Sequence, residues 1–339
     1  MKKLISVLLT LVLGFTLIPA AFAVNEDVHG DVMIYTSMYP MVVDAMDAAL
    51  KKEFPNLKVE FFYGGTGKIQ DKVTGEIATG TLGCDMMLVA DPSYAIELKE
   101  GGWLHSFEIE EPEKLAYPYD EEGYWYPVRI CNMVLAYNPE LKNLEDLPKS
   151  YKDFAEDERF AGRISMGNPL TSGTALVAVS ALSEKYGYDY FDKLGKNKVM
   201  VESGSTAVSK LESGECDEIM ILEESILQRR KEDHSKVAVI YPEDGNIIAP
   251  SPVMIIDEAK SLNVNTEACE ALANWMLSEA GQELIVDGYM HSVIKDFPKY
   301  PYDSIETSKI MENTMPVDWV QTYHNREEIR NEFQERVTQ

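Results

Sequence analysis

The sequence predicts an α/β protein made of two lobes with a ligand cleft between them. Predicted strands alternate with predicted helices, which is typical of a largely parallel sheet covered by helices. The alternation forms two sets, one complete near residue 128 and one near 250, and 339 residues suffice for two ordinary domains. Two long extended segments, 125–137 and 245–257, bracket the second set. They predict two crossover strands that join the lobes.

The first set is defined by its apolar patterns. Val43, Met46, Leu50 and Phe54 share one helical face, and Cys84 begins a continuous apolar run of the kind found in buried parallel strands. Gly-rich and Asp-Pro sequences break the runs. The expected elements, in order, are strand 31–37, helix 42–54, strand 56–63, helix 68–78, strand 84–90 and helix 92–100.

The second set repeats the pattern, and a mostly helical tail follows it. The expected elements are helix 151–157, strand 162–166, helix 175–185, strand 198–201, helix 205–212, strand 218–222, helix 224–231, strand 237–241, and then helices 266–279, 282–287 and 327–337. Because the chain crosses twice, we expect residues 24–128 plus 253–339 to form the first lobe and 129–252 the second.

Residues 1–23 have the three parts of a secretory signal peptide. Lys2 and Lys3 precede an uncharged apolar run of 15 residues, and Ala21-Phe22-Ala23 fits a cleavage site after Ala23. A helix of that length spans about 23 Å, short of the ~30 Å hydrocarbon core of a membrane. Val24 follows the cut, so no lipid-bearing cysteine would begin the mature chain. We expect a periplasmic protein without a lipid anchor.

Composition excludes several classes of function. Hydrophobic residues make up 45% and charged residues 26%, which is typical of a globular protein. Cleavage would reduce Lys plus Arg from 31 to 29 and leave Asp plus Glu at 57, so the net charge would move from −26 to −28. Such a surface repels nucleic acid and anionic lipid. The four cysteines lack metal-site spacing, and buried core thiols are favoured over one disulfide.

Candidate binding residues follow the predicted strands, where α/β proteins place their ligands. Loops rich in Gly, Ser and Thr at helix N-termini offer free N–H groups and the positive end of the helix dipole, so they suit a small anion. The same residue types are also ordinary helix caps. The candidates are Ser37, Gly65, Thr66, Gly67, Asp91, Thr171, Ser172, Gly173, Thr174, Glu223 and Glu224.

Arg129 lies in the first crossover among apolar residues and therefore needs a partner, either a carboxylate of the protein or an anionic ligand.

Enzyme motifs such as GxSxG and HExxH are missing, and the five histidines are scattered. A hydrolase with Asp91 or Glu223 as base would lack a nucleophile or metal set. A purely structural envelope protein would not need the clustered loops. We expect no enzymatic activity.

Several motifs together resemble one family. They are Val32–Ser37, the Gly-Thr-Gly at 65–67, Cys84–Pro92, Asn168–Ala175, Gly204–Glu215, Tyr241–Pro252 and Asp318–Glu328. They are similar to the periplasmic solute-binding proteins of ABC importers (extracellular solute-binding protein family 1 type), in the branch of ferric-ion, phosphonate, sugar-phosphate and thiamine binders. The resemblance implies a two-lobe, type II-like periplasmic-binding-protein fold, hinge closure, a monomer, and a cognate ABC permease in the inner membrane as partner.

The resemblance is less specific for the ligand. Ferric members use a His after the first strand and a Tyr pair, and these positions fall on Tyr39 and near Glu224-Ser225, so the paired phenolates are missing. Ferric ion stays the alternative, with Tyr39, Glu223 and Glu224 as oxygen ligands. The loops 65–67 and 171–174 resemble phosphate-gripping loops. The sequence therefore favours a small phosphorylated or phosphonate-type anion and no cofactor.

In that interpretation Glu223 and Glu224 hold an ammonium or hydroxyl end of the ligand, and Tyr39 or Trp125 covers it. The alternative for the acid pair is a helix N-terminus favoured by the dipole.

Overall fold

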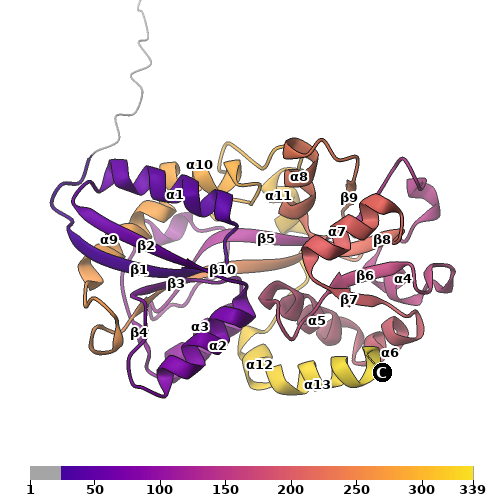
Figure 1. Ribbon diagram of the computed structural model, residues 1–339, viewed down its shortest axis with the longest axis horizontal. Coiled ribbons are helices and arrows are strands. Elements are labelled where there is room, and N and C mark those ends of the chain that lie inside the picture. The colour runs from indigo at the N-terminus through magenta and orange to yellow at the C-terminus, as the bar shows by residue number, and fades with distance from the viewer. Residues whose placement is uncertain (1–23, 339) are drawn as a thin grey trace, which may run out of the picture.

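The computed structural model describes residues 24–338, so the predicted signal peptide and its cleavage site lie outside the described residues. A mixed sheet runs through the whole molecule in the order β2-β1-β3-β10-β5-β8-β6-β7, with β4 paired to β10 and β9 to β5 (Figure 1). The two-lobe α/β fold predicted from the sequence is confirmed, because each end of this sheet has its own covering helices.

The first half of the sheet contains β1 with the parallel neighbours β2 and β3. Val43, Met46 and Leu50 lie on the buried face of α1, as the spacing predicts, together with Val42. The elements of this half are β1 (Gly30–Thr36), α1 (Pro40–Glu53), β2 (Leu57–Tyr63), α2 (Thr66–Ile77), β3 (Met86–Leu88), α3 (Pro92–Glu100) and β4 (Leu104–His105).

The second half is built around β6, which is parallel to both β7 and β8. Its elements are α4 (Tyr151–Glu156), β6 (Ile164–Gly167), α5 (Gly173–Tyr186), α6 (Asp189–Lys196), β7 (Met200–Glu202), α7 (Gly204–Ser213), β8 (Glu218–Leu222), α8 (Glu223–Glu232) and β9 (Ala238–Ile240). Helix α5 is buried along most of its length, which explains its Ala/Val-rich sequence.

The two predicted crossovers are β5 (Tyr126–Tyr137) and β10 (Ile247–Ile256), which pair antiparallel in the middle of the sheet. Figure 1 shows them running side by side from one half of the molecule to the other. The register shifts between Ser251 and Pro252. Pro250 and Pro252 lack the N–H that a regular ladder uses, which explains why an irregularity occurs here.

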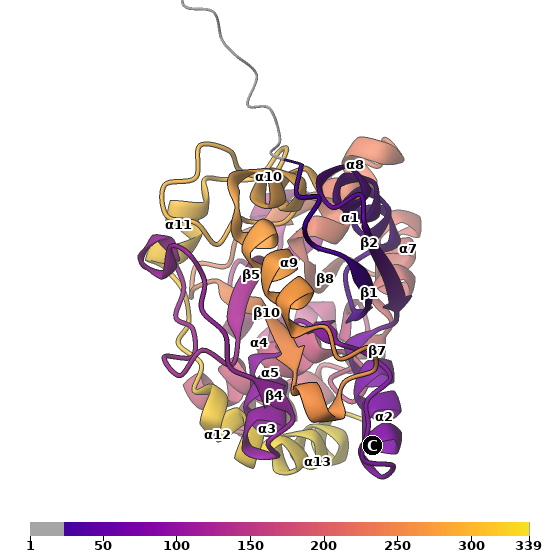
Figure 2. The same cartoon turned by 90° about the vertical axis from the view of Figure 1, so that its left-hand side faces the viewer.

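The C-terminal helices contact both halves. They are α9 (Thr266–Leu277), α10 (Glu279–Asp287), α11 (Thr307–Glu312), α12 (Trp319–His324) and α13 (Arg326–Val337). Helix α9 packs on β1 and β10, and α10 on α1, whereas α12 packs on α3 and α13 on α5 and α6. Helices α12 and α13 therefore run along one side of the molecule under both lobes (Figures 1 and 2). We propose that the lobes follow the predicted boundaries, with residues 24–128 and 253–339 in the first lobe and 129–252 in the second. Helix α13 then belongs to the first lobe by sequence and packs against the second.

Helices α6, α11 and α12 were not among the predicted elements. Each has eight residues or fewer, and α6 is held by burial of Tyr190, Phe191 and Leu194 rather than by a long periodic pattern. Short 3-10 helices occur at Pro112–Lys114, Leu144–Asp146, Glu158–Phe160 and Glu258–Lys260.

All four cysteines are buried free thiols. Within residues 24–338, every helix is too short or too polar to cross a bilayer.

Candidate functional site

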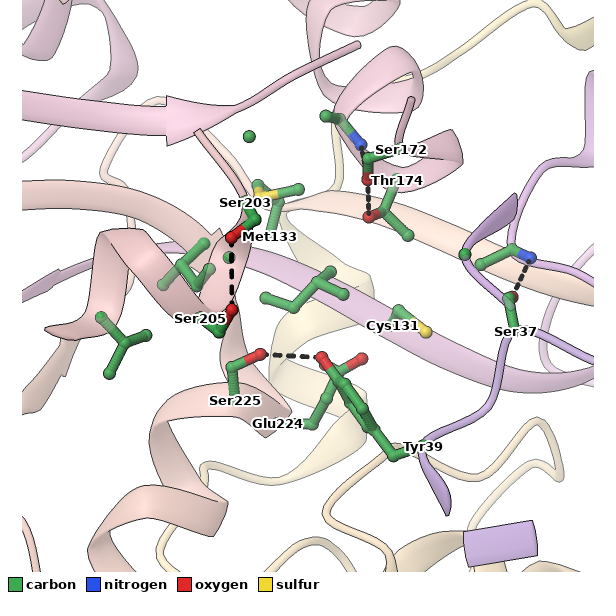
Figure 3. Close-up of a pocket in the computed structure, with 18 of the residues that line it drawn as sticks. Ser37, Tyr39, Cys131, Met133, Ser172, Thr174, Ser203, Ser205, Glu224 and Ser225 are labelled. Atoms are coloured by element: carbon green, nitrogen blue, oxygen red, sulfur yellow. Dashed lines mark hydrogen bonds between the residues drawn. The ribbon is translucent and has the colours of Figure 1, made fainter. Parts of the chain in front are cut away.

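A cavity of about 700 Å³ lies between the two halves, where the parallel strands end and their helices begin. Figure 3 shows part of its wall, with side chains from both halves facing one space. Nine of the predicted site residues line it: Ser37, Tyr39, Gly65, Thr66, Arg129, Thr171, Ser172, Thr174 and Glu224. The structure thus brings together residues up to 187 positions apart in the chain.

The cavity wall is rich in helix N-termini because β1, β2, β6, β7 and β8 each lead into a helix at this edge. The first N–H groups of a helix have no partner within the helix. Some are already capped: Ser172 Oγ accepts from the Ala175 N–H at 3.3 Å, and Ser203 Oγ accepts from the Thr206 N–H at 3.3 Å. Ser172 is therefore a helix cap that also lines the cavity.

Arg129 is a buried cation at the cavity wall, only 2% exposed. Its Nη1 lies 2.9 Å from Met290 Sδ, a weak acceptor, and its Nη2 lies 3.5 Å from Ser37 Oγ. Its Nε has no partner, and it forms no ion pair within the described part of the chain. Of the two partners considered from the sequence, a protein carboxylate is therefore not provided by residues 24–338.

Glu224 lies in the first turn of α8, and its carboxyl is 2% exposed. Its Oε1 has no hydrogen-bond partner. Burial raises the pKa of Glu224 to about 7, although the nearby positive charge of Arg129 lowers it. The cavity thus contains a cation and a proton-binding carboxyl, each with unused hydrogen-bonding capacity.

Tyr39, immediately before α1, points across the cavity toward α8 (Figure 3). Its hydroxyl lies 2.8 Å from Ser225 Oγ. Burial raises the pKa of Tyr39, so the phenol is neutral in this environment. The side chain therefore covers one end of the cavity while linking the two halves.

Glu223 was predicted at the site but does not line the cavity. Its carboxylate points the other way and accepts hydrogen bonds from Tyr241 Oη at 2.6 Å, Asn132 Nδ2 at 3.1 Å and Ser304, with His291 Nε2 at 3.1 Å. Burial alone would raise the pKa of Glu223, but these hydrogen bonds outweigh it and keep the pKa below its usual value. The carboxylate oxygens of Glu223 are therefore satisfied by groups of the protein itself.

Asp91, Gly67 and Gly173 also lie outside the cavity lining. Asp91 is fully buried and accepts from Ser93 Oγ at 2.6 Å and Gln70 Nε2 at 3.0 Å, which holds the start of α3. Gly67 and Gly173 are covered by backbone or side chains of the opposite half. These three predicted residues do not meet the others at the cavity.

Other lining residues were missed by the sequence analysis. Ser203, Gly204 and Ser205 follow β7 and begin α7, so the strand-to-helix signal used for the other loops also applied to them. Cys131 and Met133 follow Arg129 at the two-residue period of a strand and therefore share its face. Asn168, Ser225, Gln228 and Arg229 add further polar side chains to the wall, and Glu202, Glu232 and Asp233 add acidic ones.

The carboxylates that line the cavity, from Glu202, Glu224, Glu232 and Asp233, do not converge on one point in the described structure. Across residues 24–338, no group of three or more His, Cys, Asp or Glu side chains is placed to hold a metal ion. Of the three oxygen ligands considered for ferric ion, Tyr39 and Glu224 line the cavity, whereas Glu223 does not. The buried cation of Arg129 lines the same space.

A two-lobed α/β fold with two crossover strands and a polar cavity between the lobes defines a binding protein of the hinged type. The chain belongs to the family of bacterial extracellular solute-binding proteins, whose family model matches residues 85–321. Proteins of this family are transport components and not enzymes, and act outside the cytoplasm as substrate-binding proteins of ABC transporters with a membrane permease as partner.

The following relatives are distant in sequence. An uncharacterised protein of Haemophilus influenzae is 24% identical over 291 residues, covering 81% of this chain and 82% of that protein. The fold is similar to that of iron-bound HitA from Pseudomonas aeruginosa (TM-score 0.76, 21% identity, 89% of this chain and 99% of that one). It is equally similar to AfuA from Actinobacillus pleuropneumoniae with fructose-6-phosphate bound (TM-score 0.76, 19% identity, 91% and 99%). These structures bind different solutes, so they support the fold and leave the ligand open.

Proposed function

We propose that this protein captures a small phosphorylated or phosphonate-type anion in the periplasm and delivers it to an ABC permease of the inner membrane. It acts as a monomer, free of a lipid anchor, and the lobes close over the ligand. The observation that carries the proposal is the buried guanidinium of Arg129, which lines the cavity without an ion-pair partner in the described chain.

An oxyanion ligand would satisfy this guanidinium. Removing a charge from water costs several kcal/mol, and the cost is offset only by a well-placed partner of opposite charge. The starts of α2, α5 and α7 add a positive potential around the same cavity, and their N–H groups other than the capped ones add donors. The distant surface charge of the acidic protein is screened beyond ~8 Å at physiological salt, so these local donors decide the affinity.

Glu224 supports a ligand that carries more than the anionic group. A hydroxyl or ammonium on the ligand would use the free Oε1 of Glu224, while a bare inorganic phosphate would leave it unpaired. Of the two acids that the sequence analysis placed at this end, only Glu224 is available. We therefore favour an organic phosphate or phosphonate with a donor group.

Ferric ion is the alternative, and the site supports it less well. Hard Fe³⁺ prefers several oxygen ligands, and only Tyr39 and Glu224 of the three considered reach the cavity. The cation of Arg129 would repel the metal unless an anion lay between them.

A thermal-shift screen of residues 24–339 tests the proposal, with 2-aminoethylphosphonate, hexose phosphates, inorganic phosphate, thiamine and ferric citrate as compounds. A ligand at a hundred times its Kd adds about 2.7 kcal/mol to the free energy of unfolding, a shift of several degrees. We expect a phosphorylated or phosphonate compound to shift the melting temperature and ferric citrate not to. A shift with ferric citrate alone, together with a charge-transfer colour, would overturn the proposal in favour of iron.

A further inference from the structure

The starts of α2 and α5 touch across the cleft, although the two helices belong to opposite halves of the molecule (Figure 1). The Gly67 N–H donates a hydrogen bond to the Thr171 carbonyl oxygen at 3.3 Å. A Cβ added to Gly67 would lie 2.7 Å from that oxygen and 3.1 Å from the carbonyl carbon and Cα of Thr171. These obstructing atoms are all backbone, so they cannot move aside by a change of rotamer.

Gly173 makes the reciprocal contact. A Cβ at Gly173 would lie 2.7 Å from Thr66 Cγ2 and 3.0 Å from Thr66 Cβ and Oγ1. Thr66 is itself 5% exposed, so its side chain has little room to turn away. Each lobe therefore presents a glycine at the point where the other lobe approaches most closely.

The other glycines near this region are different. A Cβ at Gly65 would meet only the Thr171 oxygen, at 4.0 Å, which is ordinary contact, and a Cβ at Gly75 on α2 would meet nothing within 4 Å. Close approach between the lobes is thus found at Gly67 and Gly173, whereas a Cβ at Gly64 or Gly167 would be tight only against its own lobe, and neither Gly67 nor Gly173 lines the cavity. Their direct neighbours in the sequence, Thr66 and Ser172, do line it.

We propose that Gly67 and Gly173 are positioning residues that set how closely the two lobes approach and so hold the starts of α2 and α5 around one ligand. They act without touching the ligand. The inference rests on the proposed function for its effect on affinity, but the contact itself joins residues of the protein alone.

The physical consequence follows from the population of the closed form. The apparent affinity of a protein whose binding-competent form is only partly populated is reduced by that fraction. A methyl group at Gly67 or Gly173 would force the lobes apart by its clash, lower the closed fraction and weaken binding, while every ligand contact within each lobe stays unchanged.

Small-angle X-ray scattering of the ligand-free protein tests the proposal with Gly67→Ala, Gly173→Ala and the control Gly75→Ala. We expect both clash variants to have a larger radius of gyration than wild type, and Gly75→Ala, on the same helix, to match wild type. The double variant Thr66→Gly, Gly173→Ala removes the side chain that blocks Gly173, and we expect it to recover the wild-type radius.

Calorimetric titration with 2-aminoethylphosphonate and glucose 6-phosphate then measures the effect on binding, which we expect to be roughly tenfold weaker or more in the two clash variants. Equal radii for wild type, Gly67→Ala and Gly173→Ala would overturn the inference. Because the scattering experiment contains no ligand, that failure is distinct from a failure of the proposed function, in which wild type binds neither phosphorylated probe.

Discussion

The Tyr39 hydroxyl and Ser225 Oγ form a 2.8 Å hydrogen bond between the two lobes. Tyr39 precedes α1, and Ser225 lies in the first turn of α8. In Figure 3 this bond lies on the opposite side of the cavity from Ser172 and Thr174, next to which the glycine contacts form. Direct contacts between the two lobes are therefore present on two sides of the cavity.

We expect Tyr39→Phe to weaken ligand binding by about two- to tenfold, because a net hydrogen bond contributes roughly 0.5–1.5 kcal/mol to the state that contains it. Calorimetric titration measures the change. Ser225→Ala should have the same effect, and the double variant no more than either single one, as for two partners of one bond. Additive losses would show that the two side chains act on the ligand separately.

We expect Arg129→Met to weaken the affinity for a phosphorylated ligand by roughly thirtyfold or more, because the buried charge partner of the anion is lost. In contrast, the ligand-free variant should melt at the same or a higher temperature, since an uncompensated buried charge is replaced by an apolar chain. Differential scanning calorimetry with and without ligand measures both effects. The matched control is Arg229→Met, because Arg229 also lines the cavity but is paired with Asp233 at 2.8 Å.

The raised pKa of Glu224 predicts that stability and ligand binding depend on pH. Its pKa rises from 4.5 to about 7 on folding, so the folded state takes up a proton and loses relative stability as pH rises from about 4.5 to 7. Above pH 7 a carboxylate also repels an anion held by Arg129. For a ligand without an ammonium, such as glucose 6-phosphate, we expect wild-type affinity to fall between pH 6 and 8, and Glu224→Gln to remove most of that dependence. Parallel titration curves for the two proteins would contradict this assignment.

Glu218, at the start of β8, is another buried carboxyl with a raised pKa, and neither of its oxygens has a hydrogen-bond partner. Burial raises its pKa well above 4.5, with the charges of Asp157, Asp153 and Asp217 adding to the shift. The folded state is therefore penalised as pH rises from about 4.5 toward the folded pKa. We expect Glu218→Gln to raise the melting temperature, and to raise it more at pH 8 than at pH 5.

The control for this measurement is Glu156→Gln on α4. Hydrogen bonds from Lys152 and Lys193 lower the pKa of Glu156, so its contribution is present above pH 4.5 and disappears as pH falls through its folded pKa. The side chain is partly exposed, so its loss should be small and of opposite sign. A melting temperature of Glu218→Gln that does not change with pH relative to wild type would refute the role of Glu218.

Local patterns were enough to predict the alternation of strands and helices, the two crossovers and most of the cavity-lining loops. The neighbours Glu223 and Glu224 show where such patterns end. Both begin α8, but the direction of each side chain depends on distant partners: Asn132, His291 and Ser304 hold Glu223, while Glu224 faces the cavity. No short-range signal distinguishes the two.

The glycines of the two loops illustrate a second limit. In the sequence, Gly67 and Gly173 fit a loop that wraps an anion, but in the structure they accommodate the opposite lobe. The difference is a matter of distance between segments more than 100 residues apart, which sequence spacing does not encode. The period of two that places Cys131 and Met133 beside Arg129 was available in the sequence and was not used.

The place of β10 in the sheet has a consequence for how the chain acquires its structure. This strand lies between β3 and β5, and Val253 pairs with Leu88, so the edge of β3 stays open until the chain has been synthesised beyond residue 253. Residues 129–252 are contiguous and can become ordered earlier. Long-range pairing of this kind slows folding and leaves a strand edge exposed to other chains meanwhile. Insertion of β10 is therefore the step that covers the edge of β3 and joins the two halves of the sheet.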